Sequence, residues 1–524
     1  MRPYFAVIPL LLIVSFALAT VSPGSDADIE TFDDGCLVYN ILNENEVMVD
    51  MYKSESQIRD VTIPEEVTHD GTTYTVTSIA IGVFIDENIT SVYIPKTVVE
   101  LYAECFMGAG IERLDVDPDN KMFRSENGII YDKKMMELVR CPANIQGGCV
   151  ETPDSIAAIG RSAFDSGNVE TVKLNNGLLL IDTFAFYGCE SLTKIYVDED
   201  VNELPDSVSF INSYAFSRCI SLESLHLSNK TTFIGEAAFD ESGLTGITIP
   251  LSVDYIGERA FARCTALKAI ESDSIDYLCS DGVLFHKTDL LRLMCYPAGK
   301  EDESYIIPEE VTSISEEAFA GCVHLKRIDT NYMMSIPSMA FAHCTSLEEV
   351  NLRYATVIGQ MAFMACKNLK TIQFGSELYV IYASAFESCG LEEFTVPDTV
   401  MLIDSMVFAY CEGLKRVVFP EDSDCIVSDF VFYCDTALEE IYVGSDTVQF
   451  EDESLVVGTY VSYDPFYLNM TVPKGYTLPA EVTNENTVIA ISYIGEKPYP
   501  WENLIGVFFC VLVLIVIFRV FRSV

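Results

Sequence analysis

The residues that could do chemistry in this chain are 17 cysteines, five histidines and a large excess of acidic side chains. The histidines have no zinc-ligand spacing, and they are His69, His226, His286, His324 and His343. The sequence also has no glycine-rich phosphate loop and no Gly-x-Ser-x-Gly nucleophile elbow. We therefore predict no catalytic residue, no metal ligand and no cofactor, and a protein that is not an enzyme.

Three short acidic clusters could in principle bind Ca²⁺ through several carboxylates, namely Asp117–Asp119, Glu421–Asp424 and Glu451–Glu453. None has the Asp-x-Asp-x-Asp-Gly loop spacing, so a solvated acidic surface is the favoured interpretation. The formal net charge is −47 at pH 7. Because such a surface repels phosphate backbones, we expect no nucleic-acid partner.

The cysteines recur in register with phenylalanines. In residues 181–197, an isoleucine precedes Phe186 by five residues and Cys189 follows that phenylalanine by three. The segment 358–374 repeats this order around Phe363 and Cys366, and most steps between units are 22 or 23 residues. Thirteen phenylalanines share one position of the repeat: Phe84, Phe106, Phe164, Phe186, Phe216, Phe239, Phe261, Phe319, Phe341, Phe363, Phe386, Phe408 and Phe432. A period of this length indicates a solenoid, in which stacked units share one continuous core.

The repeat also suggests the state of the cysteines. Eight of them occupy one position: Cys189, Cys219, Cys264, Cys322, Cys344, Cys366, Cys389 and Cys411. Because one position serves every unit alike, a stack of buried free thiols explains it better than disulfides, although occasional bridges between neighbours stay possible. Disulfides are more plausible outside this column, between Cys141 and Cys149 and between Cys279 and Cys295.

Each unit must supply the elements that carry these side chains. We expect a short strand after the leucine that recurs in each unit, then a turn, then a leading apolar residue, and then one helical or 3₁₀ turn over Ala-Phe-x-x-Cys. Two steps, from Leu101 to Ile159 and from Ile256 to Ile314, are 58 residues long. Each contains an Asn-Gly or Asp-Gly turn signal followed by a short apolar run, so we predict a projecting β-hairpin near residues 117–150 and 272–305.

The Ile-Gly-x-x-Ala-Phe-x-x-Cys-x-x-Leu-x-x-Ile unit resembles the BspA-like leucine-rich repeat over about residues 79–443. The segments 234–239 and 256–261 are close to that pattern, while Val407, Val431 and the early Cys434 depart from it. The resemblance implies a leucine-rich-repeat solenoid behind a β-rich N-terminal cap. It also implies a surface protein of anaerobic microbes, with adhesion or host-matrix binding in some members, and it carries no catalytic motif.

One pattern along the later strands could form a partner-binding face. The solvent-facing pairs alternate in charge from unit to unit: Lys326-Arg327, Glu348-Glu349, Lys370-Thr371, Glu392-Glu393, Lys415-Arg416 and Glu439-Glu440. Neighbouring parallel strands would place opposite charges side by side, which favours a weakly stabilising ladder over a docking face. Possible glycosylation sites lie at Asn88, Asn229 and Asn469, each followed by the required threonine.

The two ends of the sequence indicate export and a membrane anchor. Residues 1–19 are an apolar run that ends in Ala17-Leu18-Ala19, a small-x-small pattern typical of a cleaved signal peptide. Residues 501–524 contain an uncharged stretch followed by Arg519 and Arg522, which predicts a single transmembrane helix with a cytoplasmic tail. We place a β-rich cap at 20–78, the solenoid at 79–446, and an exit cap and stalk at 447–500.

These features favour a non-catalytic cell-surface protein that binds an unidentified surface protein, extracellular protein or glycan. The alternative is a structural component of the cell envelope, in which solenoids pack side by side. An enzyme with its site in the insertions is the third and weakest hypothesis.

Overall fold

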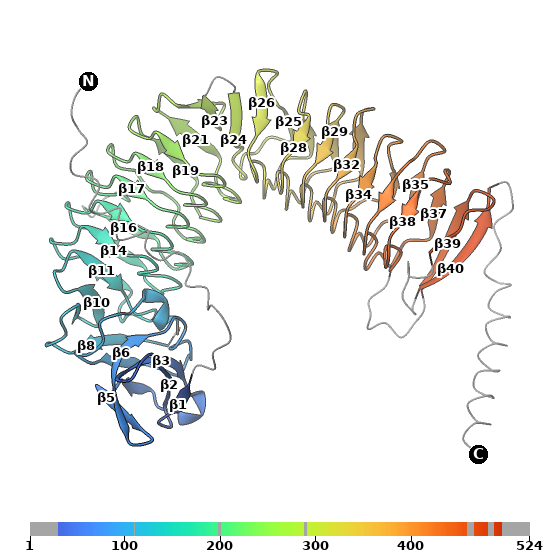
Figure 1. Cartoon of the computed structure of the whole chain (residues 1–524). Helices are drawn as coiled ribbons and strands as arrows, with labels where there is room; N and C mark the ends of the chain where they lie inside the picture. The colour runs from blue at the N-terminus through green and yellow to red at the C-terminus, as the bar shows by residue number, and fades with distance from the viewer. Residues whose placement is uncertain are drawn as a thin grey trace, which may run out of the picture.

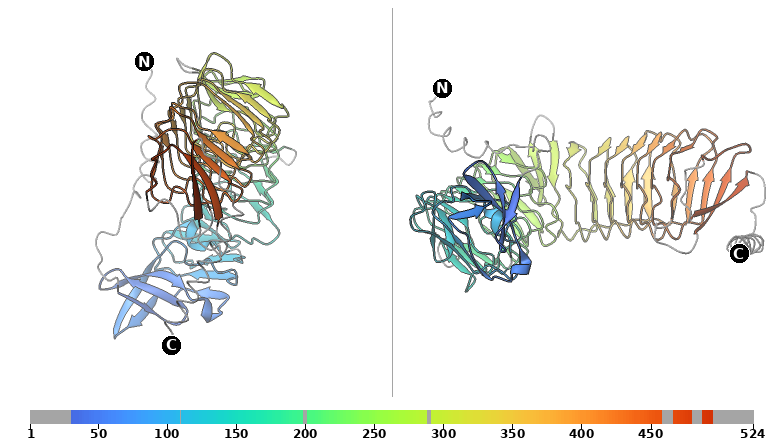
Figure 2. Two further views of the ribbon diagram at one scale, coloured as in Figure 1. Left: turned by 90° about the vertical axis from the view of Figure 1, so that its right-hand side faces the viewer. Right: turned by 60° about the horizontal axis from the view of Figure 1, so that its bottom comes forward.

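The structure is a computed structural model that describes residues 30–108, 110–197, 201–287, 291–457, 466–479 and 487–494. Its coils stack along an arch with two arms, which meet near β21 (Ala269–Ser272) and β26 (Val311–Ile314) (Figure 1). A view from another side shows the coils of the second arm as parallel rungs (Figure 2). This arrangement confirms the predicted solenoid of short parallel strands.

A five-stranded sheet covers the N-terminal end of the stack, in the order β1-β2-β3-β6-β5. Val47, Val49 and Val76 are fully buried beneath it. This sheet is the β-rich cap expected from the sequence. The strands are β1 (Thr31–Asp33), β2 (Leu37–Ile41), β3 (Glu46–Tyr52), β5 (Glu66–His69) and β6 (Thr72–Ile79), with a 3₁₀ turn η2 at Ser54–Ser56.

The longer strands of the coils form what we call the first face. Their buried positions alternate with solvent-facing ones, as in Glu349–Leu352, because strand side chains point to opposite sides of a sheet. All pair in parallel along this face, in five consecutive sheets. They are β4 (Asp60–Thr62), β7 (Ser91–Ile94), β8 (Arg113–Val116), β12 (Cys149–Glu151), β14 (Thr171–Lys173), β16 (Lys194–Tyr196), β19 (Gly246–Ile249), β21, β25 (Ser304–Ile306), β27 (Arg327–Asp329), β29 (Glu349–Leu352), β31 (Thr371–Phe374), β33 (Glu393–Thr395), β35 (Arg416–Phe419), β37 (Glu440–Val443), β39 (Phe466–Val472) and β40 (Thr487–Tyr493).

A second row of parallel strands, the second face, was not predicted. The leading isoleucines were expected only to begin the return of the chain, yet most of them end a two-residue strand that pairs with its neighbours, as Val380 and Ile381 pair with Leu402 and Ile403. These strands are β13 (Ala158–Ile159), β15 (Leu180–Ile181), β17 (Phe210–Ile211), β18 (Phe233–Ile234), β20 (Tyr255–Ile256), β28 (Ser335–Ile336), β30 (Val357–Ile358), β32 (Val380–Ile381), β34 (Leu402–Ile403), β36 (Ile426–Val427) and β38 (Gln449–Phe450).

The Ala-Phe segments are turns rather than helices in nearly every described coil. Only η3 (Ala103–Phe106) has 3₁₀ geometry among the described Ala-Phe segments. In the others the backbone passes through left-handed conformations on both sides of the phenylalanine, such as Met361 (φ 55°) and Ala365 (φ 62°) around Phe363. A left-handed residue cannot continue a right-handed helix, which explains why the predicted helical turn is absent there.

The two insertions do not project from the stack as hairpins. Each is a three-stranded antiparallel meander whose third strand joins the second face: β11 pairs in parallel with β13, and β24 pairs with β26. Tyr296, after β24, stacks on Phe319 with ring centroids 5.2 Å apart and so continues the phenylalanine column. Each long step therefore contains an additional coil. The meander strands are β9 (Phe123–Glu126), β10 (Ile129–Asp132), β11 (Glu137–Arg140), β22 (Tyr277–Ser280), β23 (Val283–Lys287) and β24 (Leu291–Cys295).

The core is a column of stacked phenylalanine rings beside a ladder of thiols. Phe363 is fully buried between Phe341 and Phe386, with ring centroids 5.1 and 5.4 Å away. The Cys389 thiol donates to the carbonyl oxygen of Phe363, one coil earlier, at 3.1 Å. The same contact recurs at 3.1 Å from Cys411 to the Phe386 carbonyl. The predicted stack of free thiols is thus confirmed, and each of these two thiols is a second donor to a carbonyl that also accepts a backbone N–H, from Cys366 at Phe363 and from Cys389 at Phe386.

The interpretation that disulfides are more plausible within the insertions is wrong, because neither pair is bonded. All described cysteines are free. Cys279 and Cys295 both pair with Leu284, on opposite sides of β23. They are therefore two strand spacings apart, about 10 Å, whereas a disulfide needs Cα atoms within about 7 Å. Cys141 is buried and Cys149 is exposed, so these two thiols lie in different environments.

Thiol reactivity provides a test of this ladder. Burial raises the pKa of Cys189 and of Cys264 to about 12, so these groups stay protonated at pH 8. We expect Cys149, which is exposed, to react rapidly with a thiol reagent in the native protein, and the buried cysteines to react only on unfolding. A C149S variant should lose the rapid phase. Rapid native labelling of Cys264, mapped by mass spectrometry, would contradict the ladder.

The last unit replaces the ladder cysteine by an acid. Asp435, three residues after Phe432, takes the position that a cysteine holds in earlier coils, so the early Cys434 is not its substitute. The Asp435 side chain is fully buried, and one carboxyl oxygen accepts a hydrogen bond from the Cys411 backbone N–H at 2.7 Å. Burial raises the pKa of Asp435 well above its usual value, although the hydrogen bond opposes this shift.

Replacing Asp435 by cysteine should remove a pH-dependent loss of stability. Because the folded-state pKa is raised, protonated Asp435 favours the folded state. That stability is complete below about pH 4 and is lost at about 1.4 kcal/mol per pH unit as the pH rises toward the folded-state pKa. D435C should therefore match the wild type near pH 4 and exceed it at pH 7 in urea unfolding. Parallel stability curves for the two proteins would show that the carboxyl does not titrate in this range.

The predicted signal peptide (1–19) and transmembrane helix (501–524) lie outside the described residues. Within the described ranges, no helix is long and apolar enough to cross a bilayer.

Candidate binding surfaces

The charged pairs predicted from the sequence lie on the outer side of the first face. Arg327 is the register partner of Glu349 on the next strand, and Arg416 lies between Glu393 and Glu440. Opposite charges are therefore adjacent, as predicted. The full candidate set occupies this one face: Lys326, Arg327, Glu348, Glu349, Lys370, Glu392, Glu393, Lys415 and Arg416.

Several of these charges are already paired between coils. The Lys326 ammonium lies 2.6 Å from a Glu303 carboxyl oxygen, and the Lys370 ammonium lies 3.1 Å from a Glu392 carboxyl oxygen. The hydrogen bond and charge of Lys370 lower the pKa of Glu392. Exposed pairs of this kind contribute little stability each. The contacts are those of a charge ladder, while a role for these residues in binding a partner stays a prediction.

A hollow opens on this charged face between β27, β29 and β31. It has a volume of about 460 Å³ and is lined by Arg327, Glu348, Glu349, Asn368, Lys370 and Thr371. The lining carries both signs of charge. A polar segment with both donors and acceptors could therefore bind there, whereas an anion or a cation alone would meet a repelling group.

The outer side of the second face is apolar, which sequence analysis missed. In the first arm Leu180, Phe210, Phe233 and Tyr255 lie side by side in register, and Phe233 stacks on Tyr255 with centroids 4.8 Å apart. Phe210 is 40% exposed and Tyr255 is 49% exposed. The signal was present as a second apolar residue immediately before most of the leading isoleucines. It was overlooked because only the inward residue of each unit had been assigned to a strand.

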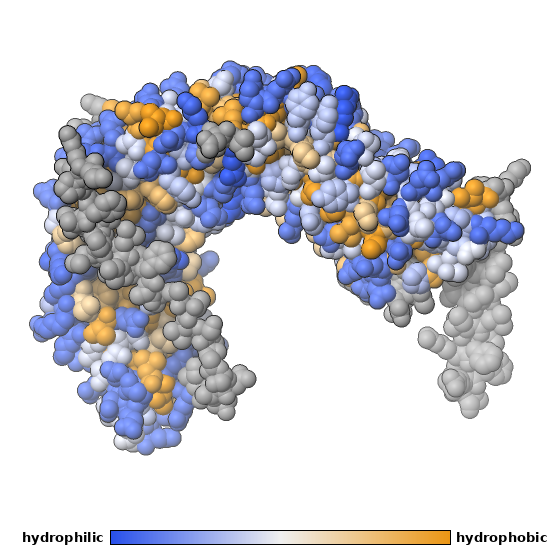
Figure 3. All heavy atoms as spheres, turned by 45° about the horizontal axis from the view of Figure 1, so that its top comes forward, coloured by the Kyte–Doolittle hydropathy of each residue, from blue (hydrophilic) through white to orange (hydrophobic). Residues whose placement is uncertain are grey.

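The second arm carries the same kind of row. Val357, Val380, Leu402 and Ile426 are register partners on β30, β32, β34 and β36. The space-filling view shows apolar side chains gathered in patches on both arms, among hydrophilic surface (Figure 3). A contiguous exposed apolar surface on a soluble fold is uncommon and marks an interaction site more often than an isolated exposed leucine does.

An open hollow lies beside the start of this second row. It measures about 440 Å³ and is lined in part by Val311, Tyr332, Met334 and Pro337, with Glu309 also contributing. Tyr332 is 52% exposed and Met334 is 65% exposed. Tyrosine and methionine supply large, adaptable contact surfaces, so this hollow extends the area on which a partner could bind.

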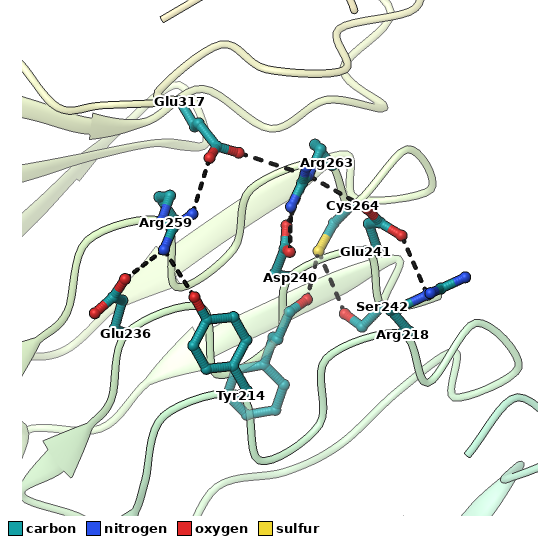
Figure 4. Close-up of polar contacts among 11 residues, drawn as sticks. Tyr214, Arg218, Glu236, Asp240, Glu241, Ser242, Arg259, Arg263, Cys264 and Glu317 are labelled. Carbon is teal, nitrogen blue, oxygen red and sulfur yellow. Dashed lines mark hydrogen bonds and ion pairs between the residues drawn. The ribbon is translucent and has the colours of Figure 1, made fainter. Parts of the chain in front are cut away.

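A network of ion pairs joins the two arms where they meet (Figure 4). The buried carboxylate of Glu317, after β26, lies 3.2 Å from the Arg259 guanidinium and 3.6 Å from that of Arg263, both after β20. Arg259 also pairs with Glu236, and Arg263 binds Asp240 through two hydrogen bonds. The two contacts of Glu317 join the coil before the second insertion to the coil after it, across the additional coil. The network holds the two arms together, and the carboxylates of Glu236, Asp240 and Glu317 each pair with an arginine.

The first insertion has an analogous bridge. Arg161 contacts Glu104 at 2.8 Å across the inserted coil. Arg140 is fully buried within that coil and donates to the carbonyl oxygens of Ser162 and Phe106 at 2.6 and 2.7 Å. The Phe106 carbonyl thus receives an arginine N–H in place of the usual thiol. The Arg161–Glu104 ion pair is structural, and sequence analysis could not find it because its two residues are 57 positions apart.

The remaining sequence-predicted sites are separate from these surfaces. Asn88 and Asn229 are exposed, while Asn469, on β39, is half-buried and donates to the Glu439 carbonyl at 3.2 Å. Asp117 caps its own turn by accepting from the Asp119 N–H and from the Tyr93 hydroxyl. Across the ranges that the structure describes, no group of three acidic, histidine or cysteine residues could hold a metal ion. Use of the sequons stays a prediction.

Comparison with known proteins identifies the repeat. The family described as BspA type leucine rich repeat region (6 copies) matches residues 46–147, 143–205, 200–292, 298–415 and 334–456. No curated protein matches the chain.

Solved structures of the same kind are also similar to the chain. A leucine rich cell surface protein from Faecalibacterium prausnitzii is 27% identical, with 80% of this chain and 95% of that chain covered and a TM-score of 0.46. The pneumococcal vaccine antigen PcpA is 21% identical over 90% of this chain and 99% of its own, with a TM-score of 0.49. A leucine-rich repeat protein from Eubacterium ventriosum is 20% identical over 62% and 84%, with a TM-score of 0.48.

Proposed function

The chain belongs to the BspA-type leucine-rich repeat family, and we propose that it is a non-catalytic recognition protein that acts at the cell surface. The single observation that carries this proposal is the row of outward apolar side chains along the second face of both arms. Leu402 and Ile426 on one arm and Phe210 and Tyr255 on the other would be costly to leave in water without a partner.

The proposed location follows from the sequence at the two ends. The signal-like residues 1–19 support export, and the apolar segment within 501–524, followed by Arg519 and Arg522, supports a single membrane anchor. In this arrangement the solenoid is outside the cell and the C-terminus is in the cytoplasm. The acidic surface keeps such an exposed solenoid soluble despite its apolar rows.

The partner is proposed to be a surface or extracellular protein, or a glycan. A binding screen with the full-length protein in zwitterionic-lipid nanodiscs should detect binding to cells, matrix proteins or glycans. A variant with polar residues on both rows, F210S/Y255S/L402S/I426S, should lose that binding while keeping the wild-type circular dichroism spectrum. Absence of binding to all three classes, or full binding by the folded variant, would overturn the proposal.

A further inference from the structure

Further exposed apolar side chains lie beside the apolar row of the second arm. Beside Val357, Val380, Leu402 and Ile426, three large side chains are exposed at the ends of the same strands: Tyr379 at 47%, Tyr382 at 44% and Met401 at 61%. We call these seven residues the apolar stripe. It crosses four parallel strands, so it extends over about 15 Å at the usual strand spacing.

Carboxylates border this stripe at both ends of its strands. Asp398 lies in the turn before β34, and Asp424 lies in the turn before β36. Asp404 directly follows β34, and Asp429 lies two residues beyond the end of β36. Three of the four, Asp398, Asp424 and Asp429, are exposed, and Asp404 is half-buried.

Basic residues are scarce around the stripe. Between residues 352 and 453 the sequence contains five Lys or Arg residues, and only Arg353 lies in a segment that leads to the second face. The others follow the thiol ladder or lie on the first face, namely Lys367, Lys370, Lys415 and Arg416. Among the described residues, no ion pair joins Asp398, Asp424 or Asp429 to a base. The negative borders are therefore not neutralised by the chain itself.

From this combination we infer that the apolar stripe binds a basic amphipathic polypeptide segment, with its apolar side chains on the stripe and its Lys or Arg side chains on the Asp borders. The inference rests on the proposed function, because it names the partner class of a recognition surface. A nucleic acid or an acidic glycan would be repelled by the borders. A polyamine or polylysine could contact the borders but would leave the apolar stripe uncovered.

The borders and the stripe would contribute in different ways. Tyr379, Met401 and Ile426 supply contact area that excludes water, which governs affinity. The aspartates attract the basic segment over a distance and fix its position, an effect that salt screens. Binding should therefore combine a salt-dependent part with a part that persists in high salt.

The test uses the full-length protein in phosphatidylcholine nanodiscs and a labelled peptide of about 14 residues, ~20 Å long if helical. The peptide carries leucines on one side and lysines on the other. Fluorescence anisotropy should show binding, which empty nanodiscs, a peptide with glutamates in place of the lysines, and a lysine peptide without leucines should not reproduce. Equal binding of the lysine-only peptide would overturn the inference, since the stripe would then play no part.

Variants locate the binding. The exposed-residue variant Y379S/M401S/I426T should weaken peptide binding at least about tenfold in both low and high salt. The variant D398N/D424N/D429N should weaken it severalfold in low salt and little in high salt. The matched control L251S/I275S replaces two apolar residues that are 65% and 74% exposed and lie outside both rows, and it should bind normally. Loss of binding in the control but not in the second-arm variants would contradict the assignment.

The outcomes also separate this inference from the proposed function. If the peptide does not bind while the screen finds another partner whose binding needs Leu402 or Ile426, the recognition function stands and the basic partner class is wrong. If no partner of any class binds, both fail.

Discussion

Replacing Glu317 by alanine should lower the free energy of unfolding by about 3 kcal/mol, the low end of the range for a broken buried ion pair. Glu317 is 3% exposed and lies between Arg259 and Arg263, whose side chains are each 25% exposed. Without this carboxylate, two partly buried guanidinium groups lose their common partner. Arg259 keeps Glu236 and Arg263 keeps Asp240, so the loss should not reach the upper end of that range.

Urea unfolding followed by far-ultraviolet circular dichroism measures this change. The adjacent Glu316 is exposed and makes no ion pair among the described residues, so E316A is a matched control that should change stability by less than about 0.5 kcal/mol. Hydrogen exchange in E317A should rise mainly in β20, β24 and β26, where the arms meet. Equal stability of E317A and E316A would show that the network does not hold the arms together.

The regular part of the fold was predictable because one physical demand repeats in every unit. A phenylalanine must fill each coil, and a small thiol fits beside it, so Phe186 and Cys189 recur at fixed spacing through the sequence. The expectation of a helical turn at these residues did not predict the backbone conformation that they adopt. The left-handed residues on both sides of most of these phenylalanines accompany hydrogen bonds to the next coil, such as Phe363 N–H to the Ala385 carbonyl at 2.8 Å, and these bonds are long-range.

The insertions could not be placed from local patterns alone. Asn127-Gly128 correctly marked a tight turn between β9 and β10. Whether that turn projected from the stack of coils or lay within it depended on β11 pairing with β13, a contact between residues about 20 positions apart in the sequence. A turn signal fixes local geometry but does not say which neighbour the following strand will join.

The two candidate binding surfaces show the same limit of prediction from local sequence patterns. Alternating charges such as Lys370 and Glu392 are conspicuous in the sequence, yet their contacts are mostly with each other. The apolar row containing Leu402 was hidden, because an apolar residue beside a core isoleucine looks like more core. Only the pairing of β32, β34 and β36, with one residue of each strand inward and one outward, reveals that the second residue faces solvent.

Replacing Phe363 by alanine should cost about 3 to 5 kcal/mol, the usual range for removing a buried phenylalanine. The ring is fully buried and stacks on Phe341 and Phe386, so the neighbouring coils cannot close the cavity without breaking their own stacking. In a solenoid each coil contacts only its neighbours, so the loss of stability should be greatest in the coils next to Phe363. The buried apolar residues also form separate clusters that meet at the insertions, one of which begins at Val283 and contains Phe363.

The measurement is native-state hydrogen exchange of F363A beside F186A, which removes the equivalent ring from the first arm. F363A should weaken protection in β29, β31 and β33 and leave β14 and β16 nearly unchanged, while F186A should do the reverse. F363L, which keeps most of the apolar volume, should show a smaller loss in the same strands. A uniform loss of protection across both arms in F363A would mean that the arch unfolds as one cooperative body. In that case the ion pairs of Glu317 and the meander β22–β24 would transmit stability between the arms more strongly than the nearest-neighbour argument allows.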